Sequence, residues 1–313
     1  MMIICDHIST RGKACKPARK WVVAGVLLAL AGCAGPGEME IRSPGEGSPV
    51  VVRTAARFAG AVSSIMRDEM EYIDTRDHGR LLQSAAFFDG LGECLNPTEG
   101  GSRDDGRTST SRLFAARAGS GWLETETDMA FWLPPGSGYV RSCGRRADVH
   151  AAVNRAPRAG YLLSKRIAFV DEVPHLFVYD ASFNVPEPHE SAVFEVIAGY
   201  MPRAFAARWE LDLATRSVEP ADARPGGRVR PVIRATADGR HAMGVWSPDI
   251  PPGQRGYGLI EFPDVVKLNC VVREGAVRPR AAYRYRCYVA VGTLDEVRAA
   301  LLDAAARFAP GRH

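Results

Sequence analysis

The chain has 313 residues, of which 46% are hydrophobic and 24% are charged. This length and composition permit a large buried core and exclude a disordered chain or a small fold that depends on metals for stability. The formal net charge of +4 is unevenly distributed along the chain, and this distribution bears on the partners that we expect.

The N-terminal segment has the pattern of a secretory signal. Residues 11–20 carry five basic side chains, and the uncharged run WVVAGVLLALA follows them. Roughly 7–15 apolar residues after a basic stretch are typical of such a signal, whereas a membrane-spanning helix needs about 20. The run ends in LAGC, residues 30–33, which resembles the bacterial lipobox. We therefore expect cleavage before Cys33 and lipid on it; the alternative is a short buried helix that ends at a chance Gly-Cys pair.

A lipidated Cys33 would place the protein in the bacterial cell envelope, with the lipid bilayer as a partner. Several acyl chains on one cysteine suffice for stable anchoring. The residue after the cysteine is Ala34 and not an aspartate, which resembles the pattern that sorts lipoproteins to the outer membrane, facing the periplasm. Residues 1–32 contain five basic side chains and one acid, so the remainder has a formal net charge of zero. We therefore expect no nucleic-acid partner, since such binding requires a standing basic surface.

The organisation that follows is a signal peptide over residues 1–32, a lipidated cysteine with a flexible tether over 33–49, and one domain over 50–313. The tether is rich in Gly, Pro and Ser and lacks periodicity. The rest shows no internal repeat, and all-β domains often reach this size.

Disulfides are the expected state of the cysteines outside the signal, because the periplasm is oxidising and no Cys/His cluster indicates zinc. A hairpin centred between residues 278 and 279 would place Cys270 opposite Cys287, within reach of a disulfide. Cys94 and Cys143 are then the remaining pair.

Period-two alternation predicts strands through most of the domain. In residues 123–133, apolar or Thr side chains alternate with Glu124, Glu126 and Asp128, and residues 209–215 alternate in the same way. Further β-branched and aromatic runs between Pro or Gly residues cover 174–185, 192–200 and 283–291. Many short strands with turns between them predict a large all-β sandwich or barrel.

One helix is predicted, at the C-terminus. Thr293 and Glu296 form a capping-box pattern, and the side chains that share one helical face behind it are Val297, Leu301, Ala305 and Phe308. We expect this helix to pack on the sheet or cover an edge.

The usual catalytic motifs are absent. The sequence contains no GxSxG, GxxxxGK[ST], GxGxxG or HExxH, so a serine hydrolase, an NTPase, a dinucleotide enzyme and a zincin all lack support. We expect no metal and no cofactor. Candidate functional residues therefore come from four polar clusters.

The first cluster is DTRDHGRLLQSA, residues 74–85, with Asp77, His78, Arg80 and Gln83. A histidine near an acid is suited to general acid or base chemistry, and an arginine offers paired donors to carboxylates and vicinal hydroxyls. The alternative is an ion pair that stabilises a turn.

The second cluster lies in the loop of residues 93–106. Asn96, Glu99, Asp104 and Asp105 carry oxygen atoms that calcium would accept, but their spacing matches no EF-hand. A plain polar loop is the favoured alternative.

The third and fourth clusters lie on predicted strands. His241 and Trp246 belong to residues 238–249, where Trp246 could stack on a sugar ring or serve as a core residue. Lys267 and Asn269 share one face of a strand whose other face is apolar, which indicates a polar concavity or an exposed surface.

These segments, with "ESAVFEVIAGYMPRAF" and "RYRCYVAVGTLDEVRAAL", resemble a branch of the galactose mutarotase-like superfamily over most of residues 50–308. The resemblance implies a β-supersandwich, in which two large antiparallel sheets present a concave face that binds carbohydrate. The superfamily includes aldose 1-epimerases, sugar-phosphate epimerases and domains of polysaccharide lyases.

The epimerase catalytic pattern does not carry over. The mid-chain histidine motif is absent, and Glu261 stands closer to Pro263-Asp264 than the late glutamate of that family. His78, Glu99 and His241 remain as candidate catalytic residues. The full expected carbohydrate-binding set is Asp77, His78, Arg80, Gln83, Asn96, Glu99, His241, Trp246, Lys267 and Asn269.

The expected function is a membrane-anchored periplasmic protein that binds carbohydrate, with epimerase- or lyase-like action on a sugar or glycan left open. The alternative is a non-enzymatic envelope lipoprotein that uses the sandwich for protein contacts. The first function predicts that His78 and Arg80 point into the same concave cavity as His241 and Lys267.

Overall fold

The computed structural model describes residues 38–45, 47–173, 175–224 and 226–309. All of them belong to one compact unit, Ala34–His313. The predicted signal peptide and the predicted lipidation of Cys33 lie outside the described residues.

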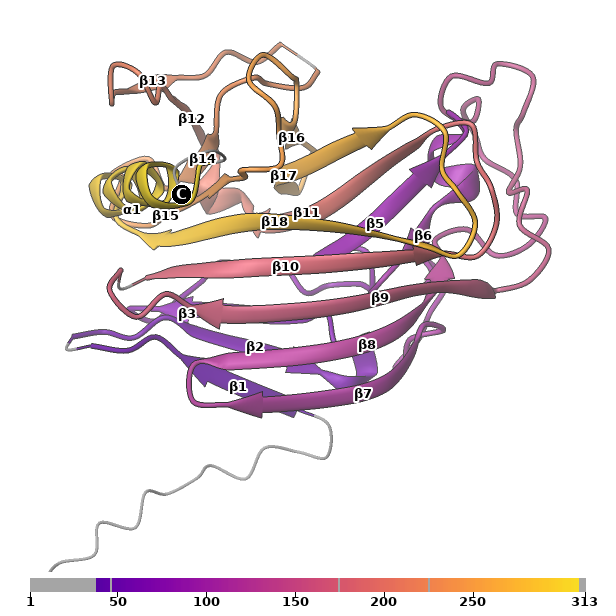
Figure 1. Cartoon of the computed structure of the whole chain (residues 1–313), viewed down its shortest axis with the longest axis horizontal. Coiled ribbons are helices and arrows are strands. Elements are labelled where there is room, and N and C mark those ends of the chain that lie inside the picture. Colours follow the sequence, from indigo (N-terminus) through magenta and orange to yellow (C-terminus); the bar gives the residue numbers. More distant parts are fainter. Residues whose placement is uncertain (1–37, 46, 174, 225, 310–313) are drawn as a thin grey trace, which may run out of the picture. The chain divides into compact units, whose positions relative to one another are not determined.

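Two large antiparallel sheets form the domain (Figure 1). In pairing order, the first sheet contains β7 (Arg112–Gly119), β8 (Trp122–Phe131), β9 (Arg158–Phe169), β10 (Leu176–Val185), β18 (Ala281–Gly292), β15 (Ala242–Trp246), β14 (Val232–Ala235), β12 (Ala207–Leu211) and β13 (Val218–Pro220). The second contains β1 (Glu38–Arg42), β2 (Val51–Ala55), β3 (Val62–Arg67), β5 (Leu82–Phe88), β11 (Ala192–Pro202), β17 (Val265–Glu274) and β16 (Tyr257–Glu261).

Short elements complete and connect the sheets. Strand β4 (Met70–Glu71) pairs with β3, and β6 (Pro97–Thr98) pairs with β5 of the second sheet and with β8 of the first. The 3₁₀ helices are η1 (Ala56–Phe58), η2 (Gly92–Leu95) and η3 (Arg203–Phe205).

The core lies between the sheets and follows the predicted alternation. On β10, Phe177, Tyr179, Ala181 and Phe183 are buried, whereas the alternate residues 178, 180 and 182 are half-buried on the outer face. Such alternation is what a strand with one core-facing side requires. The prediction of an all-β sandwich of large antiparallel sheets with one C-terminal helix is confirmed.

The C-terminal helix α1 (Leu294–Phe308) has the predicted capping box and packs on β15 and β18. Thr293 Oγ1 accepts from the Glu296 amide at 3.2 Å, and the Glu296 carboxylate accepts from the Thr293 amide at 2.7 Å. A Cβ at Gly244 of β15 would lie 2.9 Å from both Val297 and Leu301, so glycine permits this close approach.

The predicted tether is shorter than expected, because part of it is a strand. Residues 38–42 form β1, which pairs with β2 in register Ile41↔Val52. Met39 and Ile41 alternate with charged neighbours, and Ile41 is buried. The surrounding Gly, Pro and Ser residues obscured this short alternation.

The predicted disulfide between Cys270 and Cys287 is confirmed, but the reason given for it was wrong. Strand β17 pairs with β11 and β16, and β18 pairs with β10 and β15, so the two cysteines are not opposite residues of one ladder. The bond joins the two sheets with a Cα separation of 6.9 Å. Cys94 and Cys143 form the second disulfide, with a Cα separation of 5.6 Å.

Within the described part of the chain, no helix combines the length and apolar character that crossing a membrane requires.

Candidate functional site

A cleft of about 450 Å³ lies on the second sheet, over β5, β11, β16 and β17. This volume is within the range of about 300–1,000 Å³ that is usual for small-molecule sites. The residues that line it are Asp77, Gly79, Arg80, Gln83, Ala85, Phe87, Glu93, Asn96, Thr98, Trp132, Glu195, Ala198, Tyr200, Ile260, Phe262, Val265 and Lys267.

Strand β5 directs its alternate residues into this cleft. The Ser84 hydroxyl lies 3.0 Å from the Tyr179 hydroxyl of the first sheet, so Ser84 faces the core. Its neighbours Gln83 and Ala85 therefore point to the opposite face, where they line the cleft.

A β-bulge on β11 brings an acid into the same face. The register against β17 and β5 shifts after Glu195, so Glu195, Ala198 and Tyr200 all line the cleft although their spacing is not uniformly two. Bulges commonly redirect a side chain beside a functional site.

Lys267 of β17 forms a buried ion pair with Glu195. Its Nζ lies 2.8 Å and 3.0 Å from the two carboxylate oxygens, and Asn269 Nδ2 donates to the same carboxylate at 2.9 Å. Burial favours loss of the lysine charge, but the adjacent Glu195 carboxylate more than offsets this and raises the pKa of Lys267. The lysine is therefore a fixed cation in the cleft wall.

Aromatic rings form another part of the wall. Lys267 Nζ lies 5.0 Å from the centroid of the Tyr200 ring, which stacks on Phe262 at 6.0 Å. Trp132 packs against the turn at Gly79, where a Cβ would lie 2.5 Å from the indole ring. Only glycine allows this contact, so the turn and the indole are held together.

Ion pairs and hydrogen bonds hold the turn of residues 77–80 at the rim of the cleft. Arg80 forms ion pairs with Asp264 at 2.7 Å and with Asp77 at 3.2 Å. Gln83 donates to the Gly79 carbonyl at 2.9 Å and accepts from the Gly100 amide at 2.6 Å. These bonds connect the rim to the floor of the cleft.

Glu93 is a second carboxyl group in the cleft. Burial raises its pKa above the usual value, and the attraction of Lys267 and a hydrogen bond from Trp132 offset this only in part. Two carboxyl groups in different environments, one held against a lysine and one favouring its proton, are an arrangement that supports acid–base chemistry.

Five of the predicted binding residues line the cleft: Asp77, Arg80, Gln83, Asn96 and Lys267. Asn269 does not line it but donates a hydrogen bond to Glu195, which does. The cluster at residues 74–85 thus contributes side chains to the cleft. It also forms ion pairs that stabilise its own turn, which was the alternative interpretation of this cluster.

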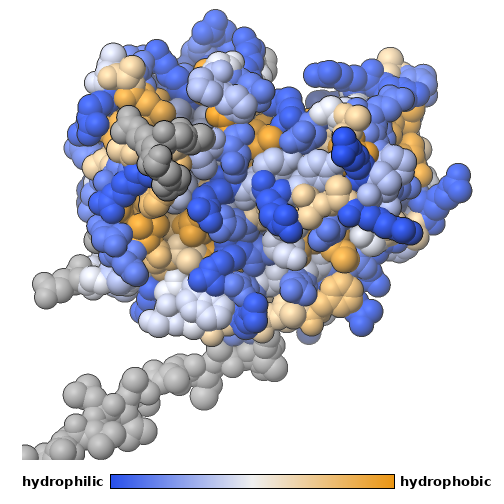
Figure 2. Space-filling view, viewed as in Figure 1, coloured by the Kyte–Doolittle hydropathy of each residue, from blue (hydrophilic) through white to orange (hydrophobic). Residues whose placement is uncertain are grey.

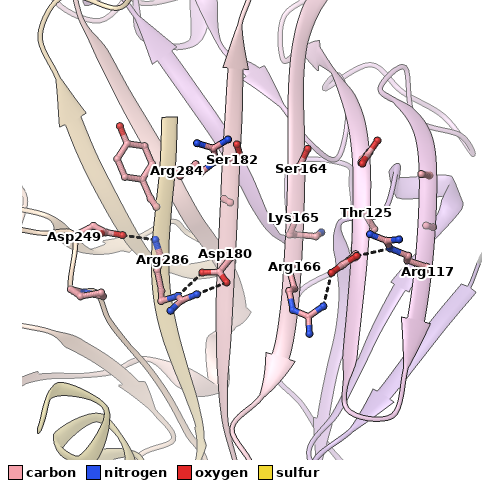
Figure 3. Close-up of a pocket in the computed structure, with 17 residues that line it drawn as sticks. Arg117, Thr125, Ser164, Lys165, Arg166, Asp180, Ser182, Asp249, Arg284 and Arg286 are labelled. Atoms are coloured by element: carbon pink, nitrogen blue, oxygen red, sulfur yellow. Dashed lines mark hydrogen bonds and ion pairs between the residues drawn. The ribbon is translucent and has the colours of Figure 1, made fainter. Parts of the chain in front are cut away.

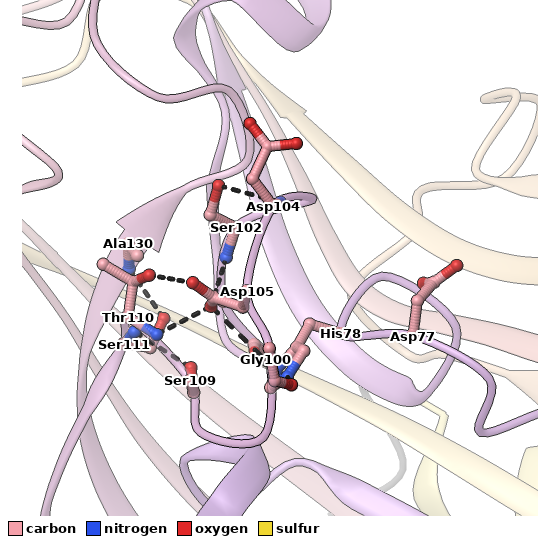
Figure 4. A network of polar contacts seen from close by, with 12 residues as sticks. Asp77, His78, Gly100, Ser102, Asp104, Asp105, Ser109, Thr110, Ser111 and Ala130 are labelled. Atoms are coloured by element: carbon pink, nitrogen blue, oxygen red, sulfur yellow. Dashed lines mark hydrogen bonds and ion pairs between the residues drawn. The ribbon is translucent and has the colours of Figure 1, made fainter.

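The prediction that His78 shares a cavity with Lys267 is wrong, because His78 does not line the cleft. Its ring is buried beside Gly100 (Figure 4), with Nδ1 2.7 Å from the Gly100 carbonyl. Nε2 lies 3.0 Å from the Gly106 carbonyl. Strand alternation could not show this, because His78 lies in a turn whose neighbours point in different directions.

Glu99 lies in the core. Its carboxylate contacts Lys165 Nζ, and both side chains are fully buried. It also accepts from the Ser84 amide at 3.1 Å. Glu99 is therefore behind β5 and does not line the cleft.

His241 and Trp246 also lie away from the cleft lining. His241 Nδ1 is 3.3 Å from the Tyr72 hydroxyl, and Trp246 is buried and stacks on Tyr288 at 5.5 Å. The core interpretation of Trp246 holds, because α1 covers one face of β15 and both faces of that strand are buried.

In the loop of residues 93–106, Asp105 accepts hydrogen bonds from the protein's own backbone. Asp105 accepts from the amides of Ser102 at 2.8 Å and Thr110 at 2.6 Å (Figure 4). No group of three or more His, Cys, Asp or Glu that could hold a metal ion occurs in the described ranges.

The predicted set left out twelve of the lining residues, and those that matter most to the chemistry of the cleft are Glu93, Trp132, Glu195 and Tyr200. Glu195 left a signal, because it is the single charge within the apolar run AVFEVIAGY. A charge inside an otherwise buried strand requires a partner, and Lys267, which shares a polar strand face with Asn269, is a cation that can supply it.

Neither the family models nor the curated proteins contain a match to this chain. Among solved structures, the Slr1438 protein from Synechocystis sp. PCC 6803 has a TM-score of 0.44 at 9% identity, covering 82% of this chain and 96% of that one. A galactose mutarotase related enzyme from Lactobacillus acidophilus has a TM-score of 0.41 at 10% identity, covering 83% and 99%.

Heparan sulfate lyase HepC from Pedobacter heparinus has a TM-score of 0.41 at 8% identity, covering 82% of this chain and 35% of the lyase. The chain thus spans about a third of that enzyme and nearly the full length of the other two.

Proposed function

We propose that the cleft on the second sheet binds a carbohydrate. The observation that carries this proposal is the meeting, in one cleft of ligand size, of amide and charged side chains with aromatic rings. Sugars present hydroxyl groups at their edges and apolar C–H faces, so they suit a site with both kinds of surface.

The pairing of the cleft's charges favours a neutral sugar. Lys267 is bound to Glu195, and Arg80 is bound to Asp264 and Asp77. Because these charges already have partners, a strongly charged ligand gains little from them, whereas hydroxyl groups can share their remaining donors and acceptors.

Asn96 supports a ligand with hydroxyl donors. Its side chain is buried, lines the cleft, and leaves Oδ1 without a hydrogen-bond partner among the described residues. An unpaired buried acceptor costs about 1–3 kcal/mol. A small rotation of the Asn96 amide toward the cleft would let a sugar hydroxyl donate to Oδ1 and remove that cost.

Any reaction on the bound sugar would use Glu93 and Glu195 as the acid–base pair. Glu93 has the raised pKa of a proton donor, and a Glu195 carboxylate oxygen lies 2.8 Å from Lys267 Nζ. We also propose that the mature protein is anchored in the bacterial envelope through Cys33, with the cleft exposed to periplasmic sugars; the support is the LAGC segment and the basic, then apolar, sequence before it.

A calorimetric screen with neutral monosaccharides and oligosaccharides tests the binding proposal. At least one sugar should bind the parent protein, and Trp132→Ala should weaken that binding about tenfold or more, because stacking and packing at the indole are lost. Trp122→Ala is the matched control, since Trp122 lies on β8 of the other sheet.

Two outcomes would contradict the proposal. One is that no neutral sugar binds the folded parent. The other is that both tryptophan variants weaken binding equally, which would indicate a general loss of stability rather than a contact in the cleft.

A further inference from the structure

A second hollow, of about 760 Å³, lies on the outer face of the first sheet and crosses β7, β8, β9, β10 and β18 (Figure 3). We call it the trough and define it by one row of side chains, Glu126, Ser164, Ser182 and Arg284. It is separate from the cleft described above, which belongs to the second sheet.

Strand pairing sets this row. Glu126 is opposite Ser164, Ser164 is opposite Ser182, and Ser182 is opposite Arg284. Their sequence neighbour Lys165 is buried, so the row faces outward. Three interstrand spacings separate the ends of the row, a length of about 14 Å.

A second row of ion pairs runs beside it. Arg117 and Arg166 both contact Glu124 at 2.5 Å, and Arg286 binds Asp180 through two bonds of 2.6 Å and 2.8 Å (Figure 3). Paired side chains are held in fixed positions, so this row forms a defined wall whose charges are already compensated.

The row that defines the trough has no such internal partners. Within the described ranges, the side chains of Glu126, Ser164, Ser182 and Arg284 make no hydrogen bond or ion pair with one another or with other residues. The two serines are small and form a hydroxyl floor, while the acid and the arginine stand at opposite ends. Figure 2 shows hydrophilic side chains spread over this face of the domain.

We propose that the trough binds an acidic oligosaccharide, with a carboxylate at Arg284 and sugar hydroxyls at the two serines and Glu126. A guanidinium presents paired donors that match a carboxylate, serine hydroxyls both donate and accept, and the Glu126 carboxylate accepts from hydroxyls. The length of the row suits a short chain of sugars rather than one ring.

The lining argues against a protein as the occupant. Stable protein interfaces depend on aromatic or aliphatic anchors that become fully buried. The aromatic side chain at the trough is Tyr285, which is half-buried and already donates its hydroxyl to Glu274 at 2.8 Å. The complementary charge is instead that of Arg284, which has no ion pair among the residues that the structure describes.

Calorimetry with tetramers of galacturonate, glucuronate and mannuronate tests this proposal, with the methyl ester of each tetramer as the uncharged control. At least one acid should bind the parent protein, and its ester should bind about tenfold more weakly or worse, because a charge-assisted pair is removed. Binding of the acid should also weaken as salt is added.

Arg284→Gln should weaken binding of the acidic tetramer about tenfold or more. Arg155→Gln is the matched control, since Arg155 is also exposed and without an ion pair among the described residues but lies outside the trough. Ser164→Val with Ser182→Val should likewise weaken binding, because it removes the hydroxyl floor while keeping β-favouring side chains.

The two sites can be told apart by one variant each. Trp132→Ala should leave acid binding unchanged, and Arg284→Gln should leave neutral-sugar binding unchanged. The proposal is overturned if no acidic tetramer binds, if ester and acid bind equally, or if binding of the acid is lost in Trp132→Ala and kept in Arg284→Gln. The last result would assign the acid to the cleft.

Discussion

Two buried ion pairs lie on opposite sides of β5 and β11 and have different consequences. Lys267 and Glu195 face the cleft, while Lys165 and Glu99 lie in the core between the sheets. Burying a charged pair is costly even when the geometry is good, and removing one partner is costlier, because it leaves an uncompensated charge.

The core pair gives a stability prediction. Lys165→Met should lower the free energy of unfolding by about 3–5 kcal/mol, because Glu99 would stay buried without its cation. Adding Glu99→Gln should restore part of the loss, since a glutamine oxygen can still accept from the Ser84 amide. Urea denaturation measures both. Arg117→Met, which breaks an exposed pair with Glu124, should cost less than about 1 kcal/mol; a similar cost for both single variants would contradict the prediction.

Glu93 gives a pH prediction. Burial raises the pKa of Glu93 above 4.5, so the folded protein keeps this proton at pH values where the unfolded chain has lost it. Stability therefore falls as pH rises through the window between 4.5 and the raised pKa. Glu93→Gln should remove this part of the slope. Urea midpoints of parent and variant across that window provide the measurement, and parallel curves would contradict it.

At the scale of elements, the alternation of polar and apolar residues predicted the strands better than it predicted which side chains line the same cleft. β10 follows period two from Phe177 onward, and β18 does so over residues 281–286, whereas residues 287–292 are buried at every position. β11 breaks the rule, because its bulge places Glu195 with Ala198 and Tyr200. A bulge arises from pairing with two neighbours, which one strand's own sequence does not contain.

Turns and strand ends limited the prediction of the site in a similar way. Arg80 and Lys267 do share a cavity, as expected, but His78 and His241 do not line it. His78 is two residues from Arg80, yet its orientation depends on the carbonyls of Gly100 and Gly106. His241 precedes a strand that is covered on both faces. These contacts are long-range, so local patterns could not show them.

The capping box of α1 gives a prediction at this scale. Thr293→Ala should lower the free energy of unfolding by about 1 kcal/mol, because the Glu296 amide loses its acceptor. Chemical denaturation checks this, with Thr215→Ala in an exposed turn as the matched control. An equal change in both variants would contradict a role for the cap.

Glu296 extends this prediction to pH. The hydrogen bond from Arg67 of β3, together with the Thr293 amide, lowers the pKa of Glu296 to about 2 despite its partial burial. The stabilisation is therefore complete above the unfolded value of 4.5 and is lost as pH falls toward 2. Glu296→Gln should lessen the loss of stability on acidification over that range, and an unchanged acid transition would argue against the pair.

For the whole molecule, the two disulfides stabilise different parts of the sandwich. Cys270–Cys287 joins the two sheets, while Cys94–Cys143 closes a longer loop beside η2 and Glu93. The loops span 17 and 49 residues, and chain entropy then assigns about 3 and 4 kcal/mol to the two bonds. The double variant Cys270→Ala/Cys287→Ala should therefore lose less stability than the double variant Cys94→Ala/Cys143→Ala. Denaturation of each under oxidising conditions tests it, and no loss in either would contradict it.

The lipid anchor is predicted from the sequence alone, because Cys33 lies outside the described residues. The basic segment, the uncharged run and LAGC together predict cleavage and lipidation. In a bacterial host, the parent should therefore fractionate with membranes and partition into detergent, whereas Cys33→Ser should become soluble or remain uncleaved. Cys15→Ser is the control, since Cys15 lies within the predicted signal and should not alter fractionation. If Cys33→Ser is cleaved and still pellets as the parent does, the membrane association must come from the folded domain, and the lipid anchor is wrong.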